Sequence, residues 1–156
     1  ERGGLKLIKA ERATADGVVA DGPFLTFYES GHPCVVGSYR LGSEEGLWLY
    51  FWSNGNIRGM GCYADGIRIS VWREWDDKGN LYSTINHHGD GWSEESIFYS
   101  NGKLRQYGYL YHKEPRRIWI GWHGNGNIKF VDAYSESGEL TFHASWNEQG
   151  AVDSRE

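Results

Sequence analysis

The sequence GLWLYFWSNGNI, residues 46–57, contains the pattern that decides the fold. An aromatic-rich run ends at Trp52, and the polar tripeptide Ser53-Asn54-Gly55 then marks a tight turn. Comparable tripeptides recur along the chain, and a period of this length indicates a repeat architecture. Their glycines follow one another at spacings of 23 or 24 residues: Gly31, Gly55, Gly79, Gly102, Gly126 and Gly150.

A second set of turn signals lies midway between these glycines. It comprises Gly42, Gly66, Gly89-Asp90-Gly91, Lys113-Glu114-Pro115 and Gly138. Two turns per unit leave two strands of about 6–8 residues each, which is an ordinary strand length. The pattern predicts an all-β fold: a repetitive antiparallel β-hairpin meander of about six 24-residue units in a single extended twisted sheet.

Equivalent positions of the six units carry the same kinds of side chain, and these rows predict ladders that run across the strands. Four positions before each turn glycine stand Phe27, Phe51, Trp75, Phe98, Trp122 and Trp146. Two positions after it stand Pro33, Ile57, Leu81, Leu104, Ile128 and Val152. Seven positions before it stand Phe24, Trp48, Trp72, Glu95, Trp119 and His143.

The turn residues favour one loop type. A two-residue type I′ turn needs positive φ at both central residues, which suits Asn-Gly but not Lys-Gly or Gln-Gly. A three-residue loop needs it only at the glycine and fits all six turns. This loop places Phe51 opposite Ile57, so we expect their two rows to share one face and to form the core.

Alternation along the strands then puts a second aromatic row on the other face, which we expect to be open. This face is our candidate binding surface, and it comprises Trp48, Tyr50, Trp52, Trp72, Glu74, Asp76, Tyr99, Trp119 and His123. A one-residue slip in register would exchange the two faces. Both faces carry aromatic residues in either case, so one must be covered by a terminal segment, a partner, a ligand or a second copy.

The ends of the chain depart from the repeat. Residues 1–21 predict an N-terminal edge strand or cap, with Leu5-Lys6-Leu7-Ile8 as the strand and Asp16-Gly17 as a turn. Residues 22–152 form the predicted repeat domain, and residues 153–156 the predicted tail. Terminal repeats with a weakened pattern are typical of caps.

Two segments resemble the MORN-repeat variant of bacterial YwqK-like proteins. The first is residues 46–57 followed by Tyr63-Ala64-Asp65-Gly66, and the second is Ile97-Phe98-Tyr99-Ser100-Asn101-Gly102-Lys103-Leu104-Arg105 followed by Tyr109. The resemblance extends over about residues 22–152. It implies a scaffold or binding module, and the YwqK-like members imply a toxin–antitoxin or immunity role.

Composition narrows the function classes. The 156 residues include 22 Gly and 24 Trp, Tyr and Phe, a mixture that argues against a helical bundle. No apolar run approaches the length of a membrane span, and a net charge of −5 argues against a general nucleic-acid binder. Only two cysteines, Cys34 and Cys62, favour a reducing cytoplasmic setting, although a start at Glu1 leaves a removed leader open.

No group of residues predicts an enzyme, so we expect no catalytic residues, no cofactor and no bound metal. His87-His88 lie near acidic residues but lack the ligand spacing of a zinc site. Glu74 and Asp76 share a face at a spacing of about 6–7 Å, which would suit a glycosidase. Two solvated acids on an exposed strand are the simpler interpretation of this pair.

The predicted open face therefore carries the functional hypotheses. Trp and Tyr anchors rimmed by polar residues are typical of a protein interface. An acidic immunity protein would suit a basic toxin, and a homo-oligomer remains open. The alternative is a module that binds a carbohydrate or another small ligand through the same aromatic face.

Overall fold

The computed structural model describes residues 7–155 and contains fourteen β-strands and no helix within that range. The predicted all-β antiparallel hairpin meander is confirmed. The chain divides after Gly79 into two compact units, which are described separately.

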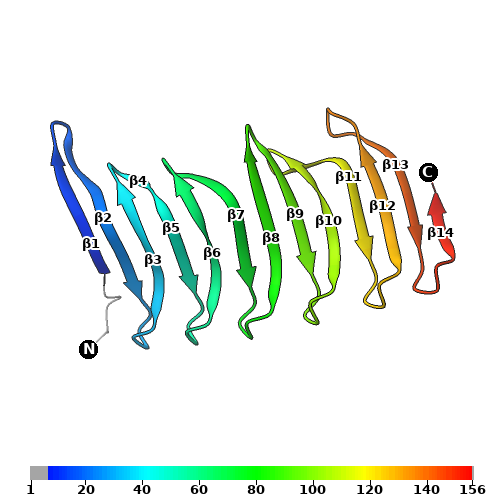
Figure 1. Cartoon of the computed structure of the whole chain (residues 1–156), viewed down its shortest axis with the longest axis horizontal. Coiled ribbons are helices and arrows are strands. Elements are labelled where there is room, and N and C mark those ends of the chain that lie inside the picture. The colour runs from blue at the N-terminus through cyan, green and yellow to red at the C-terminus, as the bar shows by residue number, and fades with distance from the viewer. Residues whose placement is uncertain (1–6, 156) are drawn as a thin grey trace. The chain divides into compact units, whose positions relative to one another are not determined.

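Unit 1 contains seven strands (Figure 1). They are β1 (Leu7–Thr14), β2 (Gly17–Phe27), β3 (Pro33–Arg40), β4 (Ser43–Glu44), β5 (Gly46–Phe51), β6 (Ile57–Ala64) and β7 (Ile67–Trp75). Each strand pairs antiparallel with the next, except that β3 pairs both with the short β4 and with β5.

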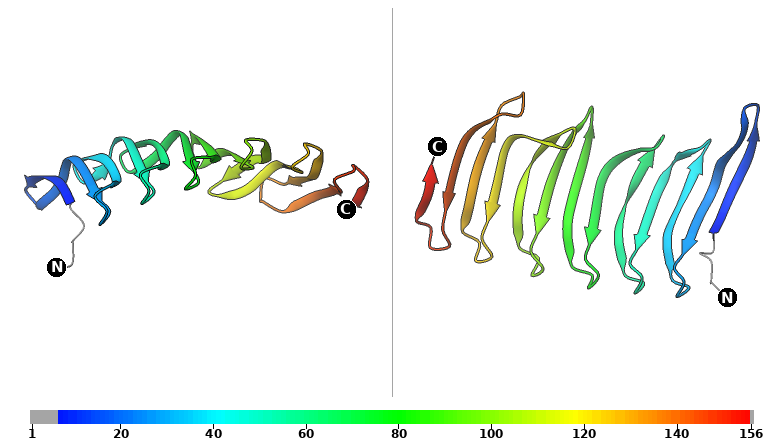
Figure 2. Two further views of the ribbon diagram at one scale, coloured as in Figure 1. Left: turned by 90° about the horizontal axis from the view of Figure 1, so that it is seen from below. Right: turned by 180° about the vertical axis from the view of Figure 1, so that it is seen from behind.

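Unit 2 is a meander of seven strands, each antiparallel to its neighbour in sequence (Figure 2, right). They are β8 (Leu81–Gly89), β9 (Trp92–Phe98), β10 (Leu104–Tyr111), β11 (Glu114–Trp122), β12 (Ile128–Tyr134), β13 (Leu140–Trp146) and β14 (Val152–Arg155).

The three-residue loop predicted for the six glycine turns is confirmed. At Gly55 the Trp52 N–H donates to the Asn56 carbonyl over 2.8 Å, and the Gly55 N–H donates to the Trp52 carbonyl over 2.9 Å. Gly55 has a φ of 89°, while Asn54 before it stays at negative φ. Phe51 therefore pairs with Ile57, as the loop type requires.

Four of the five turns in the second set use the two-residue form, whereas the Gly138 turn has the three-residue form, in which the Ser135 N–H donates to the Glu139 carbonyl. Asp65 and Gly66 both have positive φ, at 49° and 78°, as a type I′ turn demands. His112 and Lys113 adopt the same conformation without a glycine, at 49° and 70°. The turn that we expected at Lys113-Glu114-Pro115 thus lies one residue earlier, because Glu114 already belongs to β11.

The two ends contain more strand than we expected. β1 and β2 form a hairpin that joins at Ala15-Asp16, and of the predicted N-terminal strand Leu5 and Lys6 lie outside the described residues. Residues 153–155, which we assigned to a tail, belong to β14, and Ser154 and Arg155 pair with β13.

The expected assignment of the two faces is wrong in unit 1. We call the face that carries the positions seven before the turn glycines the indole face, and the other side the opposite face. On the indole face Trp48 and Trp72 are only 3% and 2% exposed, whereas Ile57 on the expected core face is 38% exposed. The sheet is a single layer here, and its best-buried side chains are those that lie flat on its own strands.

Glycines within the strands explain this burial. A β-carbon at Gly37 would overlap the Trp48 ring, and one at Gly61 would overlap the Trp72 ring. In unit 2 Gly108 has the same relation to Trp119. The large ring of one strand thus occupies the space that a side chain would take on the strand beside it. The rings of the indole face are therefore buried against the backbone of the sheet itself.

Candidate binding surfaces

The buried indoles are fixed by hydrogen bonds as well as by packing. Trp72 Nε1 donates to the Cys62 carbonyl over 3.1 Å, and Trp119 Nε1 donates to the Tyr109 carbonyl over 2.8 Å. In both strands the residue two before the indole, Ser70 or Arg117, is a bulge with positive φ. A bulge of this kind re-aims the side chains that follow it.

Trp48 lacks this bond. Its Nε1 is buried, and no acceptor in residues 7–155 lies within hydrogen-bonding distance. The carbonyl at the equivalent position, that of Ser38, accepts from the Glu45 N–H over 2.9 Å instead. The ring is held by aromatic neighbours, with Phe24 at 5.7 Å and Tyr39 at 5.1 Å between centroids.

Tyr50 and Glu74 are two of the four half-buried members of the candidate surface in unit 1, beside Trp52 and Asp76. The Tyr50 hydroxyl lies 3.4 Å from that of Tyr63, and the Arg58 guanidinium lies over the Tyr50 ring at 5.7 Å. Burial raises the pKa of the Tyr50 phenol, and the hydrogen bond with Tyr63 adds to this rise. Glu74 pairs with Gly59 of β6.

Four polar aromatic side chains form hydrogen bonds that link one repeat to the next. Each donates to the backbone carbonyl 23 residues further along the chain, which lies in the following hairpin. The bonds are Tyr28 to Phe51 and Tyr99 to Trp122, both 2.7 Å, Trp52 Nε1 to Trp75 at 3.0 Å, and His123 Nε2 to Trp146 at 2.8 Å. Asp76 stands in the same row, and its Oδ1 accepts from the Lys78 N–H over 3.0 Å.

Most of the nine predicted surface residues therefore hold the sheet together. Trp48 and Trp72 are buried, which corrects the expectation that they lie on an open face. Trp52, Tyr99, Trp119 and His123 donate to backbone carbonyls. A contact role for the seven members that keep some exposure stays a prediction.

Comparison with known proteins finds a family match for one repeat unit of the chain. The unit formed by β5, the Gly55 turn and β6 is the one whose aromatic, glycine and turn positions are described above. Residues 44–65 match the MORN repeat variant. No curated protein matches the chain. A MORN repeat points to a repeat-based binding module.

The opposite face of the MORN-matching segment is aliphatic and uncovered. A cross-strand row runs from Leu25 through Val36 and Leu49 to Met60, each paired directly with the next. Beside it, the most exposed apolar side chains are Leu47 at 51%, Ile67 at 68% and Ile69 at 39%. We call these residues, together with Ile57, the aliphatic area of unit 1. Sequence reasoning missed it as a surface because it took this face for the core.

Unit 2 carries different chemistry on its opposite face. A hollow of about 390 Å³ is lined by His88, Gly89, Asp90, Trp92, Glu94, Tyr109 and Arg117. The Arg117 guanidinium lies over the Trp92 ring at 4.5 Å and over the Tyr109 ring at 5.3 Å. His88 Nε2 lies 3.3 Å from Glu94. Hydrogen bonding with Tyr109 and burial raise the pKa of the neighbouring Tyr107.

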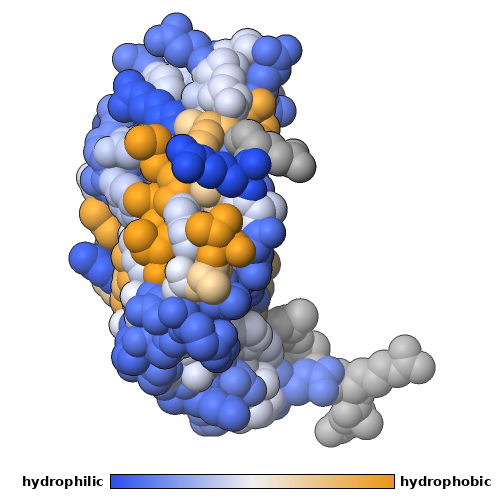
Figure 3. All heavy atoms as spheres, turned by 90° about the vertical axis from the view of Figure 1, so that its right-hand side faces the viewer, coloured by the Kyte–Doolittle hydropathy of each residue, from blue (hydrophilic) through white to orange (hydrophobic). Residues whose placement is uncertain are grey.

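Apolar side chains are also exposed in unit 2. They include Ile118, Ile128, Leu140 and Val152, which are 44–64% exposed. Figure 3, with the β14 side of the molecule toward the viewer, shows apolar residues gathered between hydrophilic ones.

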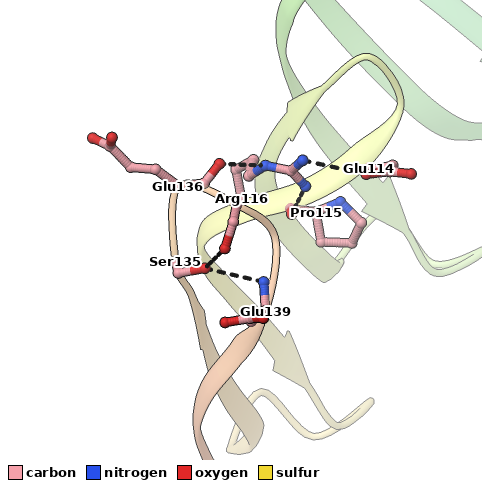
Figure 4. A network of polar contacts seen from close by, with 7 residues as sticks. Glu114, Pro115, Arg116, Ser135, Glu136 and Glu139 are labelled. Carbon is pink, nitrogen blue, oxygen red and sulfur yellow. Dashed lines mark hydrogen bonds and ion pairs between the residues drawn. The ribbon is translucent and has the colours of Figure 1, made fainter.

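A buried arginine supports the turn between β12 and β13 (Figure 4). Arg116 Nε donates to the Glu136 carbonyl over 3.0 Å and Nη1 donates to the Pro115 carbonyl over 2.8 Å, while Nη2 meets Glu114 at 3.2 Å. Arg116 is 8% exposed. A β-carbon at Gly138 would overlap the guanidinium, so this turn needs both the arginine and the glycine.

The last described hairpins replace the glycine–indole pair by polar residues. Asp132 occupies the strand-glycine position, and His143 occupies the indole position opposite it. His143 Nδ1 lies 2.6 Å from Asp132 Oδ1, and His143 Nε2 lies 3.1 Å from the Ser154 hydroxyl. Sequence reasoning missed this cluster, although comparison of the positions six after the turn glycines would have shown Asp132 where Gly37, Gly61 and Gly108 stand.

Residues 7–155 contain no group of three His, Cys, Asp or Glu arranged to hold a metal ion. Within the same range, no helix has the length and apolar character needed to span a bilayer.

Proposed function

We propose that this chain is a repeat module that binds a protein partner through the aliphatic area of unit 1. The MORN repeat at residues 44–65 supports a repeat-based binding module. The observation that carries the proposal is the exposure of Leu47 on β5 and of Ile67 and Ile69 on β7, with Cys62 of β6 paired to both Leu47 and Ile69. Exposed contiguous apolar surface is typical of an interaction site.

The charges around this area describe the surface that would fit it. Met60 at the end of the aliphatic row pairs with Arg73 of β7, which is exposed. A matching partner presents an apolar centre for Leu47 and Ile69 and a carboxylate toward Arg73. Such a centre with a polar rim is the usual anatomy of a protein interface.

A toxin is the finer hypothesis for the partner class. The resemblance to YwqK-like antitoxin and immunity proteins supports it. The net charge of −5 supports a basic partner such as a nuclease, because opposite charges accelerate association.

A photo-crosslinking amino acid at position 47 tests the proposed surface in cells that produce the chain. The matched control places it at Arg68, an exposed residue of the indole face that lies over the Trp72 ring at 4.1 Å. We expect a protein adduct from position 47 that is lost with Ile69→Glu, and none from position 68. Adducts from position 68 alone would contradict the surface. Mass spectrometry then separates a toxin from other partners and from a second copy of the chain.

A second candidate function is supported by the hollow in unit 2. Trp92, Tyr109, Arg117 and Glu94 combine aromatic surface with a donor and an acceptor, as in sites for a carbohydrate or another small polar ligand. A tryptophan-fluorescence titration with a panel of sugars tests this idea. A saturable response that is lost in Arg117→Ala supports it, and the absence of any response retires it.

A further inference from the structure

Three polar side chains on the indole face of unit 2 form one continuous hydrogen-bonded chain. Asp132 lies on β12, His143 on β13 and Ser154 on β14, so three successive strands contribute one residue each. Asp132 pairs directly with His143, and Ser154 pairs with Ser145 on the same strand as His143. The sheet register, rather than a flexible loop, therefore sets the distances between them.

The order of the atoms is that of a nucleophile, a base and an orienting acid. Asp132 Oδ1 lies 2.6 Å from His143 Nδ1, so the carboxylate accepts the Nδ1 hydrogen and selects the tautomer with a free Nε2 lone pair. His143 Nε2 lies 3.1 Å from Ser154 Oγ, within the range in which imidazole accepts a hydroxyl proton. Ser145 Oγ lies 2.8 Å from Ser154 Oγ and orients it.

The three side chains differ in burial, and this difference fits their different roles. The Asp132 side chain is 17% exposed and the His143 side chain 32% exposed, so the acid lies deeper than the base. Ser154 is half-buried on β14. β14 pairs only with β13 among the described residues.

We infer that Ser154 is a nucleophile for acyl transfer from small esters, with His143 as its base and Asp132 as a positioning residue. The Ser154 oxygen attacks the ester carbonyl carbon while its proton passes to His143 Nε2. Collapse of the tetrahedral intermediate breaks the bond to the leaving alkoxide, which takes that proton. Water then adds to the acyl-serine with His143 again accepting the proton, and the carboxylic acid and free Ser154 are released.

A fluorophosphonate probe and p-nitrophenyl acetate test this inference on the whole chain. Attack on the probe forms a serine–phosphorus bond and expels fluoride, and peptide mass spectrometry locates the product. The matched internal control is Ser137, an exposed serine that is 2.7 Å from the Ser135 hydroxyl and makes no hydrogen bond to a histidine within residues 7–155. We expect labelling at Ser154 and none at Ser137. Equal labelling of the two serines, or labelling of neither, would overturn the proposal without any need for a variant.

Variants then separate catalysis from structural hydrogen bonding. Ser154→Ala should abolish labelling and ester hydrolysis, because a free histidine alone does not form the acyl-enzyme. Asp132→Asn keeps the side-chain shape but permits the wrong imidazole tautomer, so labelling should slow by about 100-fold or more. Unchanged hydrolysis in Ser154→Ala, or an unchanged labelling rate in folded Asp132→Asn, would contradict the assigned roles. Circular dichroism establishes that each variant is folded.

Discussion

The Trp72 indole lies over Gly61 of the neighbouring strand, in the space that a β-carbon at position 61 would occupy. The same relation joins Trp48 to Gly37 and Trp119 to Gly108. A mid-strand glycine normally weakens a sheet, but here each one gives an aromatic ring its place on the backbone. The single-layer sheet thereby obtains a core without a second layer.

Substitution of Gly61 tests this relation. Gly61→Ala should lower the free energy of unfolding by about 1–3 kcal/mol, because the methyl group forces the Trp72 ring off the strand. Gly124→Ala is the matched control, since no atom lies within 4 Å of its added methyl group. Urea unfolding measures both. Equal losses of stability in the two variants would show that Gly61 has no packing role.

The side-chain hydrogen bonds that link successive repeats predict a second set of changes in stability. Tyr28→Phe and Tyr99→Phe each remove a hydroxyl that donates to a carbonyl of the following hairpin. Each should lower the free energy of unfolding by about 0.5–1.5 kcal/mol. Tyr111→Phe serves as the control, because within residues 7–155 the Tyr111 ring makes aromatic contacts while its hydroxyl makes no hydrogen bond. A loss of unfolding free energy in Tyr111→Phe as large as in Tyr99→Phe would show that the hydrogen bonds between repeats do not stabilise the sheet.

Tyr50 predicts a fall in stability at alkaline pH. Burial raises its pKa in the folded state above that of an unfolded tyrosine, which is about 10. The folded chain therefore holds the phenol proton more tightly, and this contribution is complete below about pH 10 and decreases as the pH rises above it.

Tyr50→Phe removes that titration. Its free energy of unfolding should decrease less than that of the unmodified chain between about pH 8 and about pH 11. The difference stays well below the limit of about 1.4 kcal/mol per pH unit, because the side chain is only half-buried. Denaturant melts at the two pH values measure it. Parallel decreases in both proteins would assign the alkaline loss to other groups.

Arg116 predicts a local effect at the turn between β12 and β13. Arg116→Lys retains the charge but cannot reproduce the separate bonds to the Glu136 and Pro115 carbonyls. We expect a loss of about 1–3 kcal/mol, together with faster hydrogen exchange in residues 135–139. Unchanged exchange in that turn would show that the arginine does not hold it.

The sequence predicted the hairpins because turn glycines report backbone geometry directly. Gly55 requires positive φ, and its regular recurrence specifies the loop type and the pairing of Phe51 with Ile57. The two faces could not be told apart from aromatic rows alone, since Phe51 and Trp48 are both large and apolar. The signal that distinguishes the faces is the residue on the neighbouring strand. A glycine such as Gly61 stands where an aromatic ring packs against the backbone, and so marks the indole face.

The candidate sites were harder to predict than the fold because they depend on register between strands. Asp132, His143 and Ser154 are separated by 11 residues at each step, and only the pairing of β12, β13 and β14 brings them together. The Arg117 hollow likewise needs the bulge at position 117, which nothing in the local residue types indicates.

Urea unfolding of two variants of unit 1 tests most directly which face holds the sheet and which face is free to bind. Trp72→Ala removes a side chain that is 2% exposed, and Leu47→Glu changes one that is 51% exposed. We expect Trp72→Ala to lose about 3–5 kcal/mol of unfolding free energy and Leu47→Glu to stay within about 0.5 kcal/mol of the unmodified chain. A stable Trp72→Ala beside an unfolded Leu47→Glu would contradict the assignment of the two faces.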